Sequence, residues 1–321
     1  MRAARWVGGR VLTGLVTLLG IALLVFAAVR VVPGQAERVL LGPLATDEQR
    51  AALVAELGLD RDLVTQFGIW MGKVLTGDLG TSIVSRQPVL DELALRLPVT
   101  VTIAIMALVI ALAIGIPVGV LQALRARRRG GAVASRVIGG LGISIPEFVL
   151  GALVVLLFSS VPLGITIGAF TPVAEDVGQG LLSSLLPALV LSVFCAAATA
   201  RTTRDAVLGV LVEPYVQAAV ARGETPWSIV RHHVLRNATI PILTLAATLL
   251  AYLLGGAVIV EGLFNVPGVG SYLLLAMDRR DYAVVQAGVM LAAVVFVVTS
   301  VLVELASSLV DPRVSTIGAR S

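Results

Sequence analysis

The sequence predicts an all-α polytopic membrane protein with six transmembrane helices. Of the 321 residues, 57% are hydrophobic and only 14% are charged, with a mean hydropathy of +0.97. A chain this apolar has more hydrophobic surface than a soluble domain needs to bury. A helix needs about 20 apolar residues to cross the hydrocarbon layer, and six windows satisfy that length: residues 11–32, 99–124, 137–161, 181–200, 240–260 and 284–309.

The first window is expected to remain as a membrane anchor. Arg2, Arg5 and Arg10 precede it, which also fits the charged start of a cleaved signal peptide. The apolar stretch is longer than the apolar core of a signal peptide, however, and no small-x-small cleavage site ends it. We therefore predict an uncleaved first helix.

The basic residues orient the spans, because cytoplasmic loops carry an excess of Lys and Arg. With the N-terminus inside, fifteen of the 24 basic residues are cytoplasmic, including the dense cluster at 125–129. Both termini are therefore predicted to be cytoplasmic. The predicted organisation is a tail and first helix at 1–33, an extracytoplasmic helical region at 34–95, a core with five transmembrane helices and a cytoplasmic loop (201–239) at 96–313, and a tail at 314–321.

The outer region 34–95 is too polar to cross a membrane and too long for a simple turn. Thr46 and Gln49 have the spacing of a capping box at a helix N-terminus. Leu63, Phe67 and Trp70 follow with helical spacing and are expected on the outer membrane face.

The stretch 213–241, here called the elbow, predicts two short helices joined at a glycine. Pro214 suits the first turn of a helix, where the missing N–H would have had no partner. Gly223 follows where a left-handed residue ends the first helix, and glycine adopts that conformation most easily. Thr225 and Pro226 then restart the chain as N-cap and first helical residue.

The second half of the elbow has an apolar face. Trp227, Val230 and Val234 fall on one side of a helix, at i, i+3 and i+7. Asn237 is expected to cap the next membrane-spanning helix, with Pro241 in its first turns.

A short motif lies within the elbow: Gln217-Ala218-Ala219, three further residues and Gly223, with Pro241 eighteen residues after the glycine. This string resembles the EAA loop of ABC-importer permeases, with Gln in place of Glu at its first position. On these positions alone, an ordinary cytoplasmic loop is the alternative.

Further strings are similar to the dipeptide/oligopeptide/nickel branch of those permeases. They are jointly specific although each is weak alone, and they cover about residues 57–313. The matching strings are 57–60, 77–82, 96–100, 144–148, 233–237, 261–270 and 311–313.

The resemblance implies a type I ABC importer permease fold, with this chain as the B-type subunit that forms one half of the pore. The elbow would then be the coupling helix that docks into a groove on a cytoplasmic ATPase. The elbow residues implied in coupling are Tyr215, Gln217, Ala218, Ala219, Gly223, Trp227, His233, Arg236, Asn237 and Pro241.

The resemblance also implies partners and solutes. The partners are a second homologous permease, two ABC ATPases that carry ATP and Mg, an extracytoplasmic solute-binding protein and membrane lipid. The implied location is a bacterial inner membrane. The implied solutes are peptides, with nickel chelates, opines and glycosides as alternatives within the same family.

No catalytic or cofactor-binding set is visible in the sequence. There is no GxxxxGK[ST] phosphate-binding loop, and the adjacent His232 and His233 would point about 100° apart on a helix. Cys195 lies inside an apolar window. We therefore expect no enzyme, cofactor, metal or nucleic-acid partner. A secondary transporter is the first rival, but it should show several intramembrane carboxylates; a membrane enzyme is the second.

Two carboxylates, Glu147 and Glu261, are predicted to lie near membrane depth. Glu147, between Pro146 and Phe148, lies about ten residues into the third window. An ionised carboxylate in hydrocarbon is unfavourable, so we expect Pro146, Glu147 and Phe148 to line the translocation path, or Glu147 to pair with an Arg of the partner subunit. Glu261 is expected to anchor the outer loop that contains Phe264, Pro267, Gly268 and Gly270.

Overall fold

The computed structural model describes residues 2–31, 46, 48–49, 54, 60–126, 144–160, 168–231 and 235–310, and these are mainly helical. The only β-bridge in this described part joins Thr81 and Pro88. The helices are α1 (Arg2–Val31), α4 (Leu63–Leu75), α5 (Val89–Arg125), α7 (Glu147–Ser160), α8 (Val177–Leu211), α9 (Pro214–Ala221), α10 (Pro226–Ile229), α11 (Leu235–Gly256), α12 (Val258–Leu263), α13 (Val269–Asp278) and α14 (Tyr282–Val310).

Within the described residues, five helices are long and apolar enough to cross a membrane: α1, α5, α8, α11 and α14. They confirm five of the six predicted windows. The remaining window, 137–161, appears as α7, a helix of 14 residues, and residues 137–143 lie outside the described part. The helices α5 and α8 extend beyond their windows, to Val89 and Leu211. These extensions carry charged residues, so hydropathy alone did not detect them.

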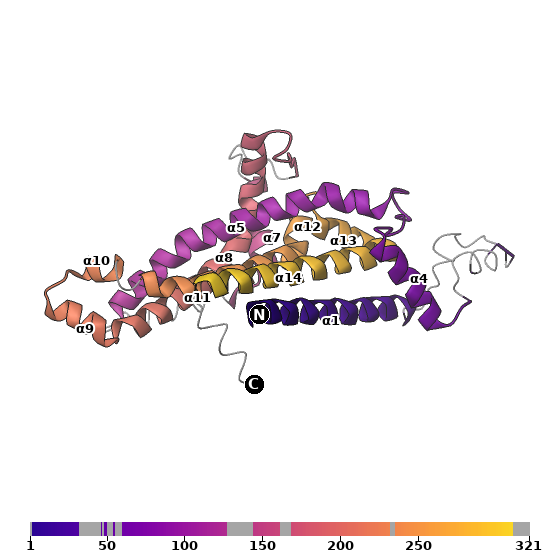
Figure 1. The fold of residues 1–321 in the computed structure, drawn as a ribbon. Helices are drawn as coiled ribbons and strands as arrows, with labels where there is room; N and C mark the ends of the chain where they lie inside the picture. The colour runs from indigo at the N-terminus through magenta and orange to yellow at the C-terminus, as the bar shows by residue number, and fades with distance from the viewer. Residues whose placement is uncertain are drawn as a thin grey trace.

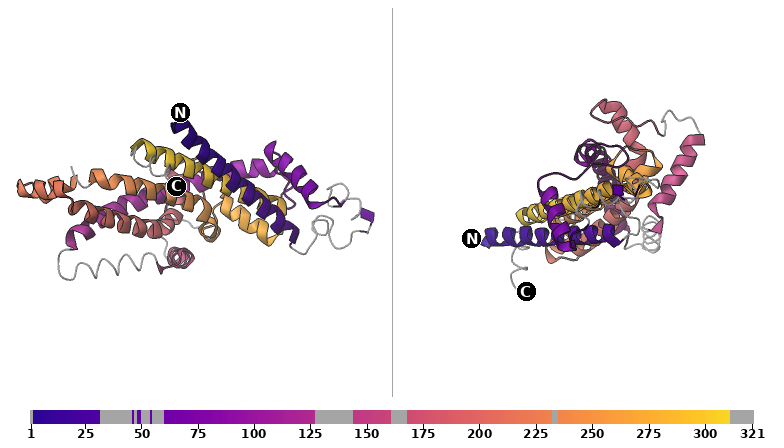
Figure 2. Two further views of the ribbon diagram at one scale, coloured as in Figure 1. Left: turned by 60° about the horizontal axis from the view of Figure 1, so that its bottom comes forward. Right: turned by 90° about the vertical axis from the view of Figure 1, so that its right-hand side faces the viewer.

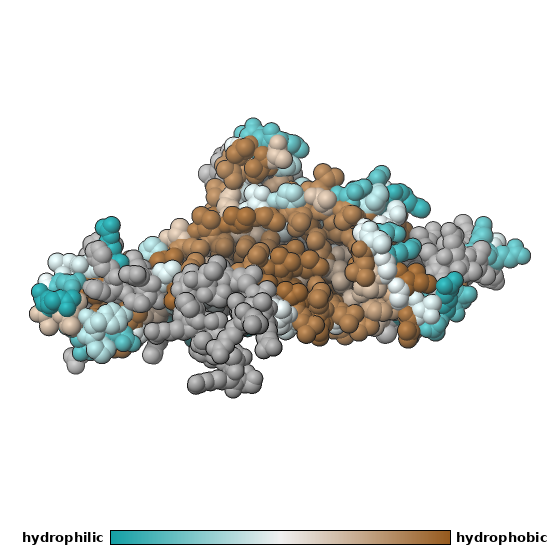
Figure 3. All heavy atoms as spheres, viewed as in Figure 1, coloured by the Kyte–Doolittle hydropathy of each residue, from teal (hydrophilic) through white to brown (hydrophobic). Residues whose placement is uncertain are grey.

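The long helices run alongside one another, with the functional segments at the two ends of the bundle. Figure 1 shows α9 and α10 at one end and α4 at the other. Figure 2 shows α7 standing out from the side of the bundle. The surface is apolar across the middle and polar toward both ends (Figure 3). This pattern matches a membrane layer crossed along the bundle axis.

The close packing of α5 on α8 rests on two glycines four residues apart. A Cβ added to Gly119 would lie 2.5 Å from the carbonyl oxygen of Ala200 and 2.6 Å from the Cβ of Thr203. One turn earlier, a Cβ on Gly115 would lie 2.6 Å from the Cβ of Thr199. The two backbones therefore approach so closely that only glycine fits on α5, as in small-residue packing between membrane helices.

A buried core joins this helix pair to α11 and α12. Ile103 of α5, Leu191 of α8 and Leu253 of α11 are fully buried in it. Cys195 lies in the same cluster as a free thiol, as its position in an apolar window predicted. The core therefore fixes how α5, α8 and α11 sit against each other.

The outer region is tied to the first span. Phe26 of α1 packs against Phe67 and Trp70 of α4, with ring centroids 5.4 and 5.8 Å away. Before α4, Thr46 and Gln49 exchange both hydrogen bonds of the predicted capping box. At the start of α4, hydrogen bonds from the Thr65 hydroxyl and amide lower the pKa of Asp62, the N-cap residue.

The glycine contact between α5 and α8 can be tested with matched alanine substitutions. Gly119→Ala should lower the free energy of unfolding of the purified chain by about 1–3 kcal/mol, because overpacking forces the two backbones apart. Gly209→Ala on exposed α8 surface is the control, since its Cβ meets no atom within 4 Å. There the change should be neutral or stabilise the helix by up to about 1 kcal/mol. Equal thermal stability of the two variants would contradict the close approach.

Candidate functional site

The first half of the elbow has the predicted geometry. Pro214 opens α9 at the first helical position, with Glu213 as N-cap. Gly223 has φ +82° and so takes the left-handed conformation. Thr225 then caps α10, because its Oγ1 accepts a 3.3 Å hydrogen bond from the amide of Ser228. These local backbone rules turn the chain at the end of the bundle.

One face of α9 packs onto the long helices. Val216 and Ala219 are buried against Val120 of α5 and Val207 of α8, in a cluster that also includes Ile229 and Val230 from α10 and the residue after it. The elbow is therefore held on the α5–α8 pair by apolar contacts.

The motif residues divide between the two faces of α9. Gln217 donates a 3.1 Å hydrogen bond from its amide nitrogen to the carbonyl oxygen of Val212, at the end of α8. Ala219 is buried, whereas Ala218 is exposed. Tyr215 is 43% exposed and Val220 is 60% exposed. The elbow thus keeps apolar side chains exposed beside the face that packs on the bundle.

The second half of the elbow differs from the prediction at Asn237. The next helix, α11, already begins at Leu235, so Asn237 is its third residue and not its N-cap. Leu and Arg are good helix formers, and they extend the helix before the asparagine. Pro241 lies inside α11. His233 and the side chains of Trp227, Arg236 and Asn237 lie outside the described part of the structure.

At the other end of the bundle, Glu261 of α12 caps the first turn of α13. Its Oε2 accepts a 3.0 Å hydrogen bond from the amide of Ser271, and its Oε1 accepts one of 2.7 Å from the Thr100 hydroxyl. The Thr100 oxygen in turn accepts a 2.9 Å bond from the amide of Val269. Helix N-termini have unpaired amides and favour a negative group. Glu261 and Thr100 supply the cap that Gly268, the N-cap residue of α13, cannot.

Two of the three glycines in the 261–270 motif, Gly268 and Gly270, make room for this carboxylate. A Cβ on Gly268 would clash with the Glu261 carboxyl, and one on Gly270 would lie 2.5 Å from the Cα of Val258. Phe264 is buried in the main core, whereas Pro267 is exposed. The predicted anchoring role of Glu261 stays a proposal, and these contacts support it.

A second outer cluster was missed by sequence reasoning. Asp281, before α14, accepts a 2.6 Å hydrogen bond from the Ser82 hydroxyl and a 2.9 Å bond from the amide of Ile83. Ser82 and Asp281 are both buried. The signal available in the sequence was an Asp directly before an apolar helix, which is typical of an N-cap. Nothing in the sequence placed Ser82 beside it.

A cation–π contact lies in the same region. The Arg96 guanidinium carbon lies 4.6 Å from the centroid of the Tyr272 ring, and Arg96 also pairs with Glu92 at 2.8 Å. These groups line a pocket of about 680 Å³ at the end of the bundle opposite the elbow. Arg96 and Tyr272 thus join α5 to α13, while Ser82 and Asp281 join the segment before α5 to the start of α14.

Glu147 has a partner that the sequence did not reveal. It is the first residue of α7, and its Oε1 accepts a 3.0 Å hydrogen bond from the hydroxyl of Tyr252 on α11. Tyr252 lies three residues before the end of the candidate span Ala238–Gly255, which places the carboxylate nearer the outer end of α11 than its centre. Phe148 is 52% exposed, and Pro146 is also exposed.

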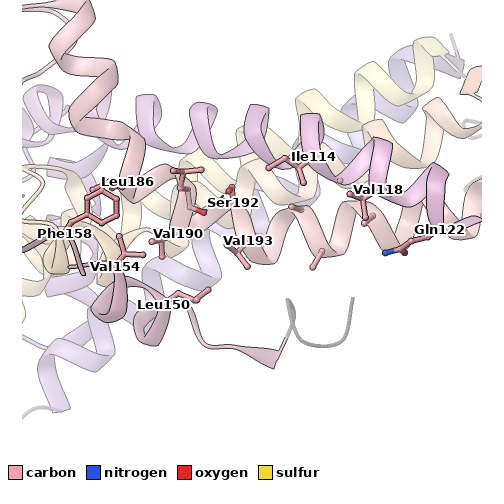
Figure 4. A pocket seen from close by; sticks show the side chains of 15 residues that line it. Ile114, Val118, Gln122, Leu150, Val154, Phe158, Leu186, Val190, Ser192 and Val193 are labelled. Carbon is pink, nitrogen blue, oxygen red and sulfur yellow. Dashed lines mark hydrogen bonds between the residues drawn. The ribbon is translucent and has the colours of Figure 1, made fainter. Parts of the chain in front are cut away.

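An apolar pocket of about 500 Å³ opens between α5, α7 and α8. Figure 4 shows Ile114 and Val118 from α5 facing it, with Val154 from α7 and Val190 from α8. Gln122 and Ser192 are the polar side chains among its lining. Such a surface can pack against a helix or hydrocarbon, and it offers no acid, base or nucleophile for chemistry.

No metal centre is found in the part of the chain that the structure describes, since it contains no group of three His, Cys, Asp or Glu placed to hold an ion.

The Glu261–Thr100 cap can be tested with two threonines of α5. Thr100→Val should lower the free energy of unfolding by about 1–3 kcal/mol, because it leaves the buried Val269 amide without its acceptor. Thr102→Val is the control, since the Thr102 hydroxyl bonds only the carbonyl of Pro98 in its own helix. The midpoint of thermal denaturation measures both. A Thr100→Val variant as stable as Thr102→Val would show that the cap contributes nothing.

Comparison with known proteins agrees with this architecture. Residues 115–316 match the family described as binding-protein-dependent transport system inner membrane component, and residues 3–104 match its N-terminal counterpart. The chain is 34% identical over 307 residues to the probable peptide ABC transporter permease protein y4tP of Sinorhizobium fredii, covering 95% of this chain and 97% of that protein.

It is also 36% identical over 304 residues to the glutathione transport system permease protein GsiC of Escherichia coli K12, covering 94% of this chain and 96% of GsiC. A solved structure of the MetNI methionine ABC transporter is similar with a TM-score of 0.49 and 23% identity, covering 70% of this chain and 95% of that chain. Members of the family are non-catalytic multi-pass proteins of the inner membrane that associate with ATPase and substrate-binding components. The chain belongs to the family of binding-protein-dependent inner membrane permeases and is a permease subunit of an ABC importer.

Proposed function

We propose that this permease imports peptides and that the elbow is the point at which ATPase closure reaches it. The single observation that carries the coupling proposal is the geometry of α9. One face of it is fixed to α5 and α8 through Val216 and Ala219, while Tyr215 and Val220 remain exposed. A segment that is packed rigidly on one face and still has exposed apolar side chains is suited to transmit movement from a docked protein.

The packing around α9 indicates which helices would move with it. Force on α9 passes to α8, which continues directly into the elbow, and to α5 through the shared cluster around Val120. The glycine contact at Gly115 and Gly119 then joins α5 to α8 over further turns. The helix α5 extends to the end of the bundle opposite the elbow, where it contacts α13, so a rigid-body movement at the elbow can reach that end.

The peptide assignment is supported by the names of two relatives, a probable peptide permease and a glutathione permease. Glutathione is itself a tripeptide derivative, so both names describe small peptides. Nickel chelates, opines and glycosides are the alternative solutes. Measuring uptake of tri-alanine, a nickel chelate, an opine and a glycoside by the assembled transporter separates these alternatives.

The pore is proposed to need a second, homologous permease. The apolar pocket between α5, α7 and α8, and exposed residues such as Leu153 and Leu156 on α7, leave apolar surface on this chain for a neighbouring subunit or lipid. Two ATPases are proposed to dock on the two elbows, with ATP and Mg held by those subunits. A solute-binding protein is proposed to dock at the outer end.

The coupling proposal is tested by two substitutions at one position. Gly223→Val should leave the amount of chain in the membrane unchanged but reduce ATPase co-purification and uptake, because a β-branched residue in the left-handed conformation is strained by about 1–2 kcal/mol. Gly223→Asn is the control, since asparagine tolerates that conformation. A Cβ at this position meets no atom within 4 Å, so only the backbone is tested. Normal ATPase co-purification and normal uptake in the valine variant would contradict the coupling role of the elbow.

The proposed orientation, with both termini and the elbow in the cytoplasm, is tested by labelling cysteines. Ala174→Cys before α8 and Ala221→Cys at the end of α9 are both exposed, whereas the native Cys195 is buried. In cells expressing the chain alone, position 174 should react with an impermeant maleimide from outside. Position 221 should react only after the membrane is opened. The reverse pattern would place the elbow on the wrong side for an ATPase.

A further inference from the structure

A polar pair lies within the membrane-spanning part of the bundle, apart from the elbow and the outer clusters. Glu147 of α7 and Tyr252 of α11 are joined by the 3.0 Å hydrogen bond between carboxylate and hydroxyl. Tyr252 belongs to the candidate span Ala238–Gly255. The pair therefore brings a carboxylate into the apolar layer of the protein.

The surface around this pair is open and otherwise apolar. Tyr252 is 42% exposed and Glu147 is half-buried. The neighbouring α7 residues Phe148, Val149 and Leu153 are exposed as well. An ionised carboxylate facing hydrocarbon is unfavourable. This patch is thus suited to water or a polar partner, and poorly suited to lipid.

The carboxylate has unused hydrogen-bonding capacity. An ionised carboxylate has about four acceptor positions, and the Tyr252 hydroxyl takes one of them. Within the described part of the chain, no Lys or Arg forms an ion pair with Glu147. A cation supplied by another molecule would satisfy the remaining positions with charge-assisted hydrogen bonds.

The tyrosine that binds the carboxylate belongs to an aromatic pair. The ring of Phe194 on α8 lies 5.3 Å from the ring of Tyr252, at an interplanar angle of 44°. A carboxylate next to aromatic faces favours an ammonium group, which gains both an ion pair and a cation–π contact. The described residues contain no three-ligand cluster for a metal, so an organic amine fits this chemistry better than a bare metal ion.

We propose that Glu147, Tyr252 and Phe194 form a recognition site for a cationic amine of the transported solute. The proposal rests on the proposed function as a peptide importer and deepens it, because it gives the membrane path a selectivity of its own. Glu147 contacts the amine, and Phe194 provides an aromatic wall. Tyr252 is a positioning residue whose hydroxyl orients the carboxylate.

The test separates charge from shape at position 147 in the complete transporter, reconstituted in vesicles with both permeases, the ATPases and the loaded solute-binding protein. The probe is tri-alanine, which carries one terminal amine. Glu147→Gln keeps the size and can still accept the Tyr252 hydrogen bond, but it loses the charge. Uptake per ATP hydrolysed should fall about tenfold, as expected for loss of a hydrogen bond to a charged group. Glu147→Asp should retain roughly half of the uptake or more, because it keeps the charge.

The control variant and the ATPase measurement distinguish this site from general damage. Glu175→Gln, at an exposed position before α8, should transport like the wild type. ATP hydrolysis stimulated by the loaded binding protein should persist in Glu147→Gln. If the wild-type complex shows neither that stimulation nor tri-alanine uptake, the proposed function fails, independently of Glu147.

Three results would overturn the amine site. The first is Glu147→Gln uptake equal to that of the wild type. The second is equal loss in the Gln and Asp variants, which would show that shape rather than charge matters. The third is loss of thermal stability of the complex that is restored by neutralising an Arg on the second permease, which would assign Glu147 to an ion pair between subunits.

Discussion

The backbone approach between α5 and α8 is the constraint on which the rest of the structure depends. Gly115 and Gly119 leave no space for a side chain between α5 and the carbonyl groups and threonines of α8. In a membrane, apolar side chains gain little by leaving lipid, so such close packing is a main source of helix association. The two helices that the elbow is built on are therefore held together independently of the elbow.

The helix α5 connects both functional ends of the bundle. At its inner end, Val120 and Ala123 belong to the cluster that holds the elbow. At its outer end, Thr100 joins the Glu261 carboxylate to the first turn of α13. Its 37 residues span about 55 Å at 1.5 Å per residue. One helix thus contacts the segment proposed to face the ATPase and the segment proposed to face the outside.

Local features of this fold could be predicted from sequence, because backbone rules act over a few residues. Pro214, Gly223, Thr225 and the Thr46–Gln49 capping pair all follow such rules, and all have the predicted geometry. Asn237 was misplaced because Leu235 and Arg236 extend the helix before it. When good helix formers precede a residue that can act as an N-cap, the sequence pattern alone does not decide where the helix begins.

Contacts between distant segments could not be predicted in the same way. Thr100 and Glu261 are 161 residues apart, and Ser82 and Asp281 are 199 apart. The outer glycine motif was visible as a string, but its reason, space for a buried carboxylate, appears only in three dimensions. The glycine pair of α5 was likewise hidden in an apolar window. Tyr252 gave no sign that it would meet Glu147.

The elbow, α5 and α8 are proposed to move as one body when the ATPases close. Spin labels at position 213 beside α9 and at exposed Val109 on α5, read by pulsed electron–electron double resonance in the reconstituted transporter, test this movement directly. A single rigid body predicts the same mean distance between the two labels in the nucleotide-free and ATP-bound states. A shift of about 5 Å, the rise of one helical turn, would show that the elbow moves separately from α5 and would contradict the proposal.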